Sequence, residues 1–448
     1  MEIDSRPAEI SHLYRDHLSV MLGRTAAALD RCGFDALLIH SGSQRTVFRD
    51  DLQYPFRVNA LFKALVPLTH APDCWLLVRP ARRPVLIFLR EEDYWHQPAE
   101  LPDEPWVAEF DVKIVGSREA GLRSLPRDLS RCAFLGEPSP GLSALAIRAM
   151  NPQPLLLQLE FERAIKTPYE LAMLRAANRR GARAHRAAEQ AFRAGASEFA
   201  IELAFLAAAG QREQDLPYNP IIALNRHAAV LHYQLLEHTP PPERLSMLID
   251  AGTEFAGYAC DITRTYAAQA GDFAALVQRM DELQRGLCDL VRPGVDWRDV
   301  HVASYERIGR LLGDAGILTC GADEALGSGV TSVFYPHGVG HLLGLQVHDA
   351  GGLLANAAGD EIPRPQGHPF LRLTRVLQPG FVVTMEPGIY FIEPLLQRAR
   401  AGDHAGRIDW RRVAELSPYG GIRIEDDLAV RASGPCENLT RDAFAQMT

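Results

Sequence analysis

Apolar residues recur at helical spacing near the beginning of the chain, from about residue 9 to residue 31. Because a helix buries one face with an apolar residue every three to four positions, this pattern predicts a helix that ends at Cys32-Gly33. Short apolar runs bounded by Pro and Gly follow, and runs of this length predict strands. The predicted strands cover residues 36–39, 74–78, 85–89, 112–115 and 132–135. The first part of the chain is therefore predicted to be an α/β domain.

A second helical pattern begins after Thr167 and extends to about residue 194. Thr167 suits the N-cap position, and Pro168 suits the first helical position, where its missing N–H costs no hydrogen bond. We place the boundary just before this helix, which gives domains 1–163 and 164–448. Further helices are predicted at about 197–209, 272–291 and 297–315, and strands at 246–251, 257–265, 382–386 and 421–426. This succession predicts an α+β domain with a mainly antiparallel sheet.

Length, charge and cysteine content narrow the class of protein. A chain of 448 residues exceeds what one hydrophobic core usually serves, which agrees with two domains. Its net charge of -9 argues against a nucleic-acid partner and against a surface that binds anionic lipid. The seven cysteines are scattered without a CxxC pair, as expected of reduced thiols. Because neither a basic leader nor a long apolar stretch is evident, we expect a cytoplasmic protein without a membrane partner.

Two aspartates, Asp250 and Asp261, lie within apolar, strand-like sequence. Gly252 and Gly257 bracket a turn between them, so the two carboxylates can lie side by side on adjacent strands. Like charges that are buried together destabilise a fold unless a cation or a proton lies between them. The segment therefore indicates either a metal site or a shared proton, and the structural alternative is an aspartate that caps a turn.

Three histidines, His337, His341 and His348, lie within one glycine-rich segment of fourteen residues, 335–348. Glycine lets the backbone approach a ligand closely, which an ordinary core strand does not require. A single histidine is more often structural than a ligand. The clustering of three makes this segment a candidate binding site beside that structural alternative.

Two glutamates, Glu386 and Glu425, each end an apolar strand-like run, where a solvated glutamate is unexpected. Taken singly, each glutamate fits a salt bridge at a strand end. Together with Asp250, Asp261 and one histidine they form a set of four carboxylates and one imidazole. Such a hard, oxygen-rich set suits a pair of Mn²⁺-like ions better than it suits metals that prefer thiolates.

Four motifs in this order resemble those of a known family: the Asp250/Asp261 hairpin, PHGVGH at 336–341, EPGIYF at 386–391 and GGIRIED at 420–426. The family is the pita-bread metallopeptidases, which include methionine aminopeptidase, aminopeptidase P and prolidase. FRDDLQYPFRVN at 48–59 and CWLLV at 74–78 resemble the bacterial Xaa-Pro dipeptidases and the similar organophosphorus acid anhydrolases. The resemblance covers essentially the whole chain. It implies a creatinase-like α/β N-terminal domain and a pita-bread catalytic domain with a curved sheet.

The resemblance implies two divalent metal ions per subunit, with Mn²⁺ expected and Co²⁺ or Zn²⁺ as alternatives. No ligand position is substituted. Asp261 and Glu425 match the ligands that bridge both ions. Asp250 matches the ligand of one ion, and His341 with Glu386 match the ligands of the other.

Catalytic and substrate-binding positions are also implied by the resemblance. Glu386 would carry a proton from the attacking water to the leaving proline nitrogen. His337 and His348 match the two histidines that contact substrate without binding metal, and His348 would stabilise the oxyanion. Further residues match positions that line the substrate pocket: Tyr218, His232 and Arg423. Either Arg423 or protonated His337 would bind the substrate carboxylate.

The implied reaction is hydrolysis of dipeptides with a C-terminal proline, with a side activity on organophosphate triesters. The alternatives are an aminopeptidase P-like enzyme and, from another class, a metal-free pita-bread binding module or a creatinase-like amidinohydrolase. The resemblance also implies a homodimer. In it, Asp50 of the partner subunit or Asp51 of the partner subunit would reach the amino end of the substrate.

Overall fold

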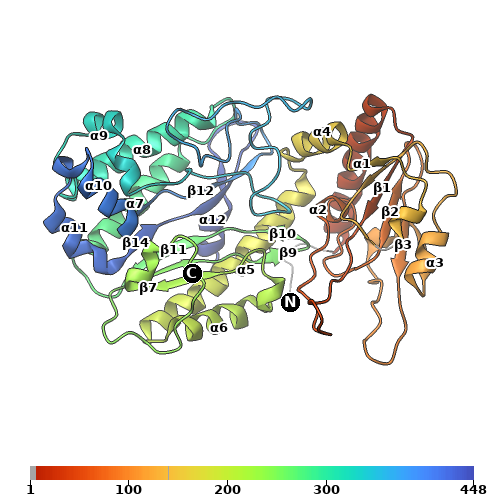
Figure 1. Ribbon diagram of the computed structural model, residues 1–448, viewed down its shortest axis with the longest axis horizontal. Helices are drawn as coiled ribbons and strands as arrows, with labels where there is room; N and C mark the ends of the chain where they lie inside the picture. Colours follow the sequence, from red (N-terminus) through yellow and green to blue (C-terminus); the bar gives the residue numbers. More distant parts are fainter. Residues whose placement is uncertain (1–6, 140, 448) are drawn as a thin grey trace. The chain divides into compact units, whose positions relative to one another are not determined.

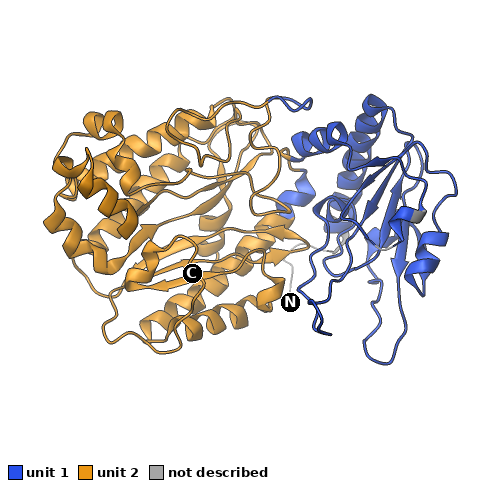
Figure 2. Cartoon of the chain, viewed as in Figure 1, with its two compact units in different colours: residues 1–163, 167–172, 356–360 blue, residues 164–166, 173–355, 361–448 orange. Residues whose placement is uncertain are grey.

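The computed structural model describes residues 7–139 and 141–447 (Figure 1). The expectation that the chain has no leader falls partly on residues 1–6, which lie outside the described residues. Two compact units divide the chain (Figure 2). The first comprises residues 1–163, 167–172 and 356–360, and the second comprises residues 164–166, 173–355 and 361–448. No sequence signal indicated that the short segment 356–360 joins the first unit.

The first unit contains one mixed sheet of six strands in the order β4-β3-β2-β1-β5-β6. Its strands are β1 (Ala36–His40), β2 (Trp75–Val78), β3 (Val85–Leu89), β4 (Asp111–Val115), β5 (Cys132–Leu135) and β6 (Ala149–Met150). The central strand β1 pairs antiparallel with β2 and parallel with β5. Because β1 and its two neighbours are buried, they are apolar except for His40 at the end of β1. The predicted strands therefore all occur, and only the two-residue β6 was not predicted.

Helices complete the first unit. The predicted first helix is α1 (Pro7–Cys32), and it packs against α4 (Gln153–Arg163) (Figure 1). Two shorter helices are α2 (Ala60–Lys63) and α3 (Arg118–Arg123). The helices α2 to α4 were not predicted; α2 and α3 are too short for an apolar period to stand out.

The predicted long helices of the remaining chain are present as α5 (Pro168–Arg193), α6 (Glu198–Ala209), α7 (Asp272–Cys288) and α8 (Trp297–Asp314). Thr167 caps α5 as predicted: Glu170 N donates to Thr167 Oγ1 over 3.4 Å, and Thr167 N donates to Glu170 Oε2 over 2.8 Å. This reciprocal pair satisfies two N–H groups that the first turn cannot satisfy itself. Short helices were missed, namely α9 (Ala322–Ser328), α10 (Glu393–Ala401), α11 (Trp410–Leu416) and α12 (Leu439–Ala445).

All strand pairs of the second unit are antiparallel. The strands are β7 (Ile221–Leu224), β8 (Ser246–Asp250), β9 (Glu254–Phe255), β10 (Tyr258–Ala259), β11 (Thr263–Ala267), β12 (Val382–Met385), β13 (Gly388–Tyr390), β14 (Gly421–Arg423), β15 (Asp426–Ala429) and β16 (Glu437–Asn438). They form short sheets in the orders β11-β8-β7, β12-β15-β16, β13-β14 and β10-β9. The predicted α+β composition with a mainly antiparallel sheet is confirmed.

Two predicted strands of this unit are wrong in one respect, because each is interrupted at a carboxylate. The run 257–265 forms β10 and β11 with residues 260–262 between them, and the run 421–426 is broken at Ile424 and Glu425. An isolated bridge pairs Thr263 with Glu425 and so joins the two interrupted runs. The interruptions therefore let Asp261 and Glu425 lie beside each other. Unbroken strands would continue their regular backbone pairing through these positions.

Helices α5 and α6 cover the sheet β11-β8-β7. Ala184, Ala188 and Phe192 of α5 and Phe205 of α6 share one apolar cluster with Ile249 of β8. Helices α7 and α8 pack against β12 and the segment 339–342 in a second cluster. Among the described residues, none of the helices combines the length and apolarity needed to cross a membrane.

Candidate metal centre

Asp250 and Asp261 lie close together, but not as directly paired strand residues. Asp250 ends β8 and is paired with Thr263 of β11, so Asp261 lies two residues before its expected partner position. The small β9–β10 hairpin lies in the connection between the two strands and accommodates this two-residue offset. Tyr218 connects the two aspartates, because its hydroxyl lies 2.7 Å from Asp250 Oδ1 and 2.6 Å from Asp261 Oδ1.

Strand β12 and the segment beside it carry the next two candidate ligands. Thr384 N donates to His341 O over 2.9 Å, and His341 N donates to Thr384 Oγ1 over 3.1 Å. Glu386 directly follows β12 and its N–H donates to Val339 O over 2.9 Å. These backbone contacts hold His341 and Glu386 on neighbouring extended segments, so their side chains lie close together.

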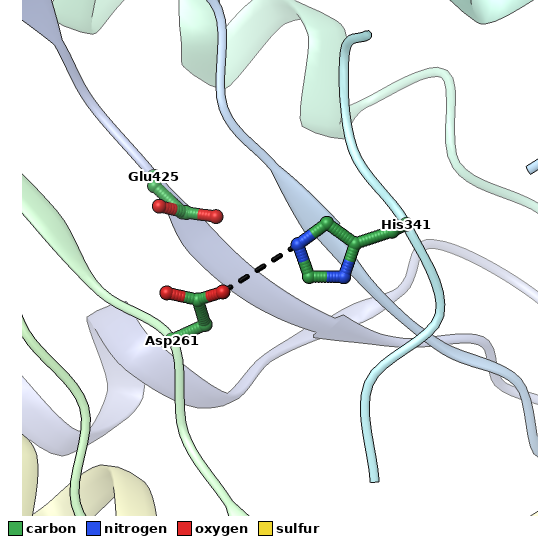
Figure 3. A group of neighbouring side chains, drawn as sticks. All are labelled: Asp261, His341 and Glu425. Carbon is green, nitrogen blue, oxygen red and sulfur yellow. Dashed lines mark ion pairs between the residues drawn. The ribbon is translucent and has the colours of Figure 1, made fainter. Parts of the chain in front are cut away.

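Glu425 is fixed by Thr263. Its N–H donates to Thr263 O over 3.0 Å, and Thr263 Oγ1 donates to Glu425 Oε2 over 2.7 Å. The side chains of Asp261, His341 and Glu425 are buried, and each offers a ligand atom within 4.8 Å of the others (Figure 3). His341 Nε2 lies 3.5 Å from Asp261 Oδ2 and 3.6 Å from Glu386 Oε1.

One pocket of about 550 Å³ contains all five predicted ligands. Asp250, Asp261, His341, Glu386 and Glu425 line it. The chain segments that carry them are far apart in the sequence, so only the fold brings them together.

The electrostatics of this cluster indicate that it is built for cations. Burial, together with the neighbouring carboxylates, raises the pKa of Glu425 well above its usual value and that of Glu386 to about 7. Burial also raises the pKa of Asp250. Burial opposes ionisation of Asp261 too, but hydrogen bonds from His341 and Tyr218 lower its net pKa. Carboxylates crowded in this way hold protons unless cations replace them.

His341 and Tyr218 lead to the same conclusion. Burial alone would lower the pKa of His341, but Asp261 and Glu386 raise it to about 9. The single Tyr218 hydroxyl faces two aspartate oxygens, and a phenol has only one proton to donate. Divalent ions would remove both conflicts, and four carboxylates with one imidazole are the hard donor set that such ions prefer. The residues therefore fit the two ions.

The other two histidines of the glycine-rich segment also line the pocket. His337 Nε2 contacts Tyr390 OH at 2.9 Å, and its Nδ1 lies 3.5 Å from Glu386 Oε2. Burial and the nearby Arg423 lower the pKa of His337 to about 3. The His348 ring lies edge-on to His341 at 4.5 Å, and burial with the charge of His341 lowers its pKa to about 4. Both rings are therefore neutral near pH 7.

Of the three predicted substrate-binding residues, one is available to substrate and two bind other groups of the protein. His232 is exposed and lines the pocket. Tyr218 lies on the aspartates instead of lining the pocket. Arg423 lines the pocket, but its donors bind within the protein: Nη2 to Asp250, Nη1 to Tyr390 OH at 2.9 Å and Nε to Thr263 Oγ1 at 3.1 Å. Arg423 thus orients the ligands, and little of its guanidinium is left for substrate.

Sequence reasoning missed two arginines in this pocket, Arg364 and Arg372. Arg364 Nε donates to Leu371 O over 2.6 Å. Among the described residues, no hydrogen bond or ion pair engages the Arg372 side chain. Both lie in a segment without helices or strands, so nothing in the local pattern distinguished them from the chain's many surface arginines.

Hydrolases that use divalent metal ions are the class of protein that this fold and this pocket define. Comparison with known sequences narrows the class: the chain belongs to metallopeptidase family M24, which it matches over residues 172–432. Residues 12–161 match the N-terminal domain of Xaa-Pro dipeptidase.

Close relatives cover nearly the whole chain. A Xaa-Pro dipeptidase of Xanthomonas euvesicatoria pv. vesicatoria (strain 85-10) is 50% identical over 437 residues, which are 97% of this chain and 98% of the relative. A Xaa-Pro dipeptidase of Stenotrophomonas maltophilia (strain K279a) is 49% identical over 434 residues, 97% of each chain. The predicted metallopeptidase of the Xaa-Pro dipeptidase type is therefore confirmed.

Solved structures with the same fold are more distant in sequence. Pseudomonas aeruginosa aminopeptidase PepP matches with a TM-score of 0.72 at 24% identity, covering 96% of this chain and 98% of that one. Zn-substituted E. coli aminopeptidase P in complex with product matches with a TM-score of 0.70 at 23% identity, covering 98% of each. These matches confirm the predicted two-domain pita-bread fold.

Proposed function

We propose that this chain hydrolyses dipeptides whose second residue is proline, with two divalent ions held by Asp250, Asp261, His341, Glu386 and Glu425. The observation that carries the proposal is the convergence of these five side chains on one pocket. Similarity to Xaa-Pro dipeptidases along nearly the whole chain supports the substrate class.

In the proposed site, Asp261 and Glu425 would serve both ions, Asp250 would serve one of them, and His341 with Glu386 would serve the other. Bound ions of this kind polarise the scissile carbonyl and make water a nucleophile near neutral pH. The oxygen-rich donor set supports Mn²⁺, with Co²⁺ or Zn²⁺ as alternatives.

Glu386 is the proposed proton carrier. Its carboxylate takes a proton from the attacking water and delivers it to the proline nitrogen, which must gain one to leave as an amine. His337 Nδ1 donates to Gly338 O over 2.8 Å, and this contact orients the neutral ring at 3.5 Å from Glu386 Oε2. We assign His348 to the carbonyl oxygen: as a neutral imidazole it has one N–H, which donates to the developing oxyanion.

The substrate carboxylate requires a cation that the protein does not already use. Arg423 is bound to Asp250, Tyr390 and Thr263, and His337 is neutral because its pKa is lowered. We therefore propose Arg372 for this role, since it lines the pocket and has an uncommitted guanidinium. A cation at this position favours dipeptides over longer chains, whose proline carries no free carboxylate.

The decisive experiment replaces His341 with Ala and measures bound manganese and Ala-Pro cleavage. We expect both to fall, because a ligand is lost. His348→Ala is the matched control, since its ring lies beside His341 but is not a proposed ligand: it should keep its manganese and lose turnover. Full activity and unchanged metal content in His341→Ala would refute the ligand assignment.

Several further proposals accompany this function. We propose a cytoplasmic homodimer with functional domains 1–163 and 164–448 and a side activity on organophosphate triesters, which turnover of a phosphotriester against Ala-Pro would test. All seven cysteines are free, which agrees with a reducing compartment.

Asp50 Oδ1 accepts hydrogen bonds from the N–H groups of Asp51 and Leu52, so its carboxylate is committed to a turn. We therefore favour Asp51 as the residue that reaches a partner's substrate.

A further inference from the structure

One wall of the pocket is a loop that lacks regular structure of its own. Leu231 and His232 line the pocket, and they belong to residues 225–245, which join β7 to β8. Apart from one 3-10 turn at Asn225–Ala229, this loop contains no helix or strand. Its position must therefore be set by contacts to other parts of the fold.

A single buried carboxylate makes several of those contacts. Glu198, at the first position of α6, is 1% exposed. Its Oε1 accepts from Leu224 N over 2.7 Å and contacts His227 Nδ1 at 2.8 Å. Its Oε2 accepts from Tyr233 OH over 2.8 Å and from Glu237 N over 2.9 Å. Two of these groups are backbone N–H groups at the ends of the segment 224–237, and two are side chains within it.

Neighbouring contacts support the same attachment. Phe199 N donates to Glu237 O over 3.2 Å, and the Phe199 ring stacks on His238 at 4.3 Å. Tyr233 is buried and directly follows His232 in the sequence. Holding Tyr233 therefore fixes the backbone next to His232, which lines the pocket.

We propose that Glu198 is a positioning residue for substrate recognition, which it serves by holding Leu231 and His232 at the pocket wall. It is not a catalytic residue, since it does not line that pocket. The inference rests on the proposed function, because it assumes that His232 contacts the dipeptide. Only a carboxylate fits the position, because a glutamine offers one oxygen and turns an NH₂ group towards donors.

The test compares Glu198→Gln with Glu202→Gln. Glu202 lies one turn further along α6 and is also buried, but among the described residues it makes no hydrogen bond to the loop, which makes it a matched control. For Ala-Pro we expect Glu198→Gln to raise KM about tenfold with kcat within about threefold of wild type, because the lost hydrogen bonds position substrate-binding groups and not the reacting ones. Bound manganese should be unchanged, and trypsin should cut faster at Arg226 and Arg244. Glu202→Gln should change none of these.

A double variant separates positioning from general destabilisation. If Glu198 acts through His232, the KM increases caused by Glu198→Gln and His232→Ala overlap when the two are combined, and do not multiply. Multiplying effects would overturn the proposal, as would unchanged KM and trypsin resistance in Glu198→Gln, or an equal KM increase in Glu202→Gln.

Two further measurements keep the proposal testable. If Glu198→Gln does not fold, Tyr233→Phe removes only one of the four donors and should raise KM to a smaller extent with full manganese content, and an unchanged KM there would overturn the proposal. Wild-type protein that binds manganese but leaves Ala-Pro intact would overturn the dipeptidase function alone, because the trypsin comparison judges the loop attachment independently.

Discussion

Lys166 and Asp349 form an ion pair that is enclosed by the protein: Nζ lies 2.8 Å from Oδ2, and each side chain is 1% exposed. Asp349 directly follows His348, and its N–H donates to Leu342 O over 2.9 Å, which closes the segment that also carries His341. Gly344 passes directly over the pair, where a Cβ atom would collide with the Asp349 carboxylate and the Lys166 side chain. The pair thus fixes the end of the segment that carries His341 and His348.

Breaking this pair on one side should destabilise the second unit strongly. In Lys166→Met the Asp349 carboxylate keeps its burial but loses its countercharge, which costs about 3–5 kcal/mol of unfolding free energy. Urea denaturation measures the change. The double variant Lys166→Met with Asp349→Leu removes both charges and should recover most of the loss. A double variant that is as unstable as the single one would contradict this account.

Much of the fold follows from the sequence because its elements are locally encoded. The buried strands β1, β2 and β5 are apolar apart from His40, and α5 carries its own Thr167 and Glu170 cap. The interruption at Asp261 could not be foreseen, because it depends on pairing between Thr263 and Glu425, which are far apart in the sequence.

In the candidate site, too, some features were evident in the sequence and others depend on the fold. The types of the five ligands and their strand-like surroundings were evident in the sequence, and motif resemblance selected His341 among three histidines. The roles of the arginines were not evident, since a guanidinium can bind either protein or substrate. Only the contacts of Arg423 with Asp250 and Tyr390 assign it to the protein and leave Arg372 available.

Gly252 should be essential for metal binding. A Cβ atom at this position would collide with the Cys260 carbonyl oxygen and press on the Tyr218 ring. Gly252→Ala must therefore displace the segment that carries Asp261 away from Asp250, and we expect at least one of the two ions to be lost on dialysis. Metal analysis measures this. Gly327→Ala is the control, because a Cβ atom there meets nothing within 4 Å, and it should keep both ions.

Arg372→Met should weaken binding of substrates with a free carboxylate. A charge-assisted hydrogen bond contributes about 1.5–3 kcal/mol, so KM for Ala-Pro should rise by about tenfold or more. The matched comparison is Ala-prolinamide, which has no carboxylate and should be cleaved equally well by both proteins. Equal losses for the two substrates would show that Arg372 does not bind this carboxylate.

His40 should make the stability of the first unit depend on pH. Its ring is buried against Trp75, with centroids 4.2 Å apart, and neither ring nitrogen has a hydrogen-bond partner among the described residues. Burial lowers the pKa of His40 to about 4, although Asp73 opposes the shift. Because the unfolded chain, with a histidine pKa near 6.5, takes up a proton that the folded chain excludes, this contribution to stability is complete above about pH 6.5 and is lost as the pH falls towards about 4.

Replacing His40 should remove this dependence. Between pH 7 and pH 5 the wild-type unfolding free energy should fall by about 2 kcal/mol more than that of His40→Phe, whose ring can still pack on Trp75 but binds no proton. Urea unfolding of both proteins at the two pH values measures the difference, and other titrating groups cancel in the comparison. Parallel losses in the two proteins would mean that His40 is protonated in the folded state as readily as in the unfolded one, and that its burial carries no penalty for charge.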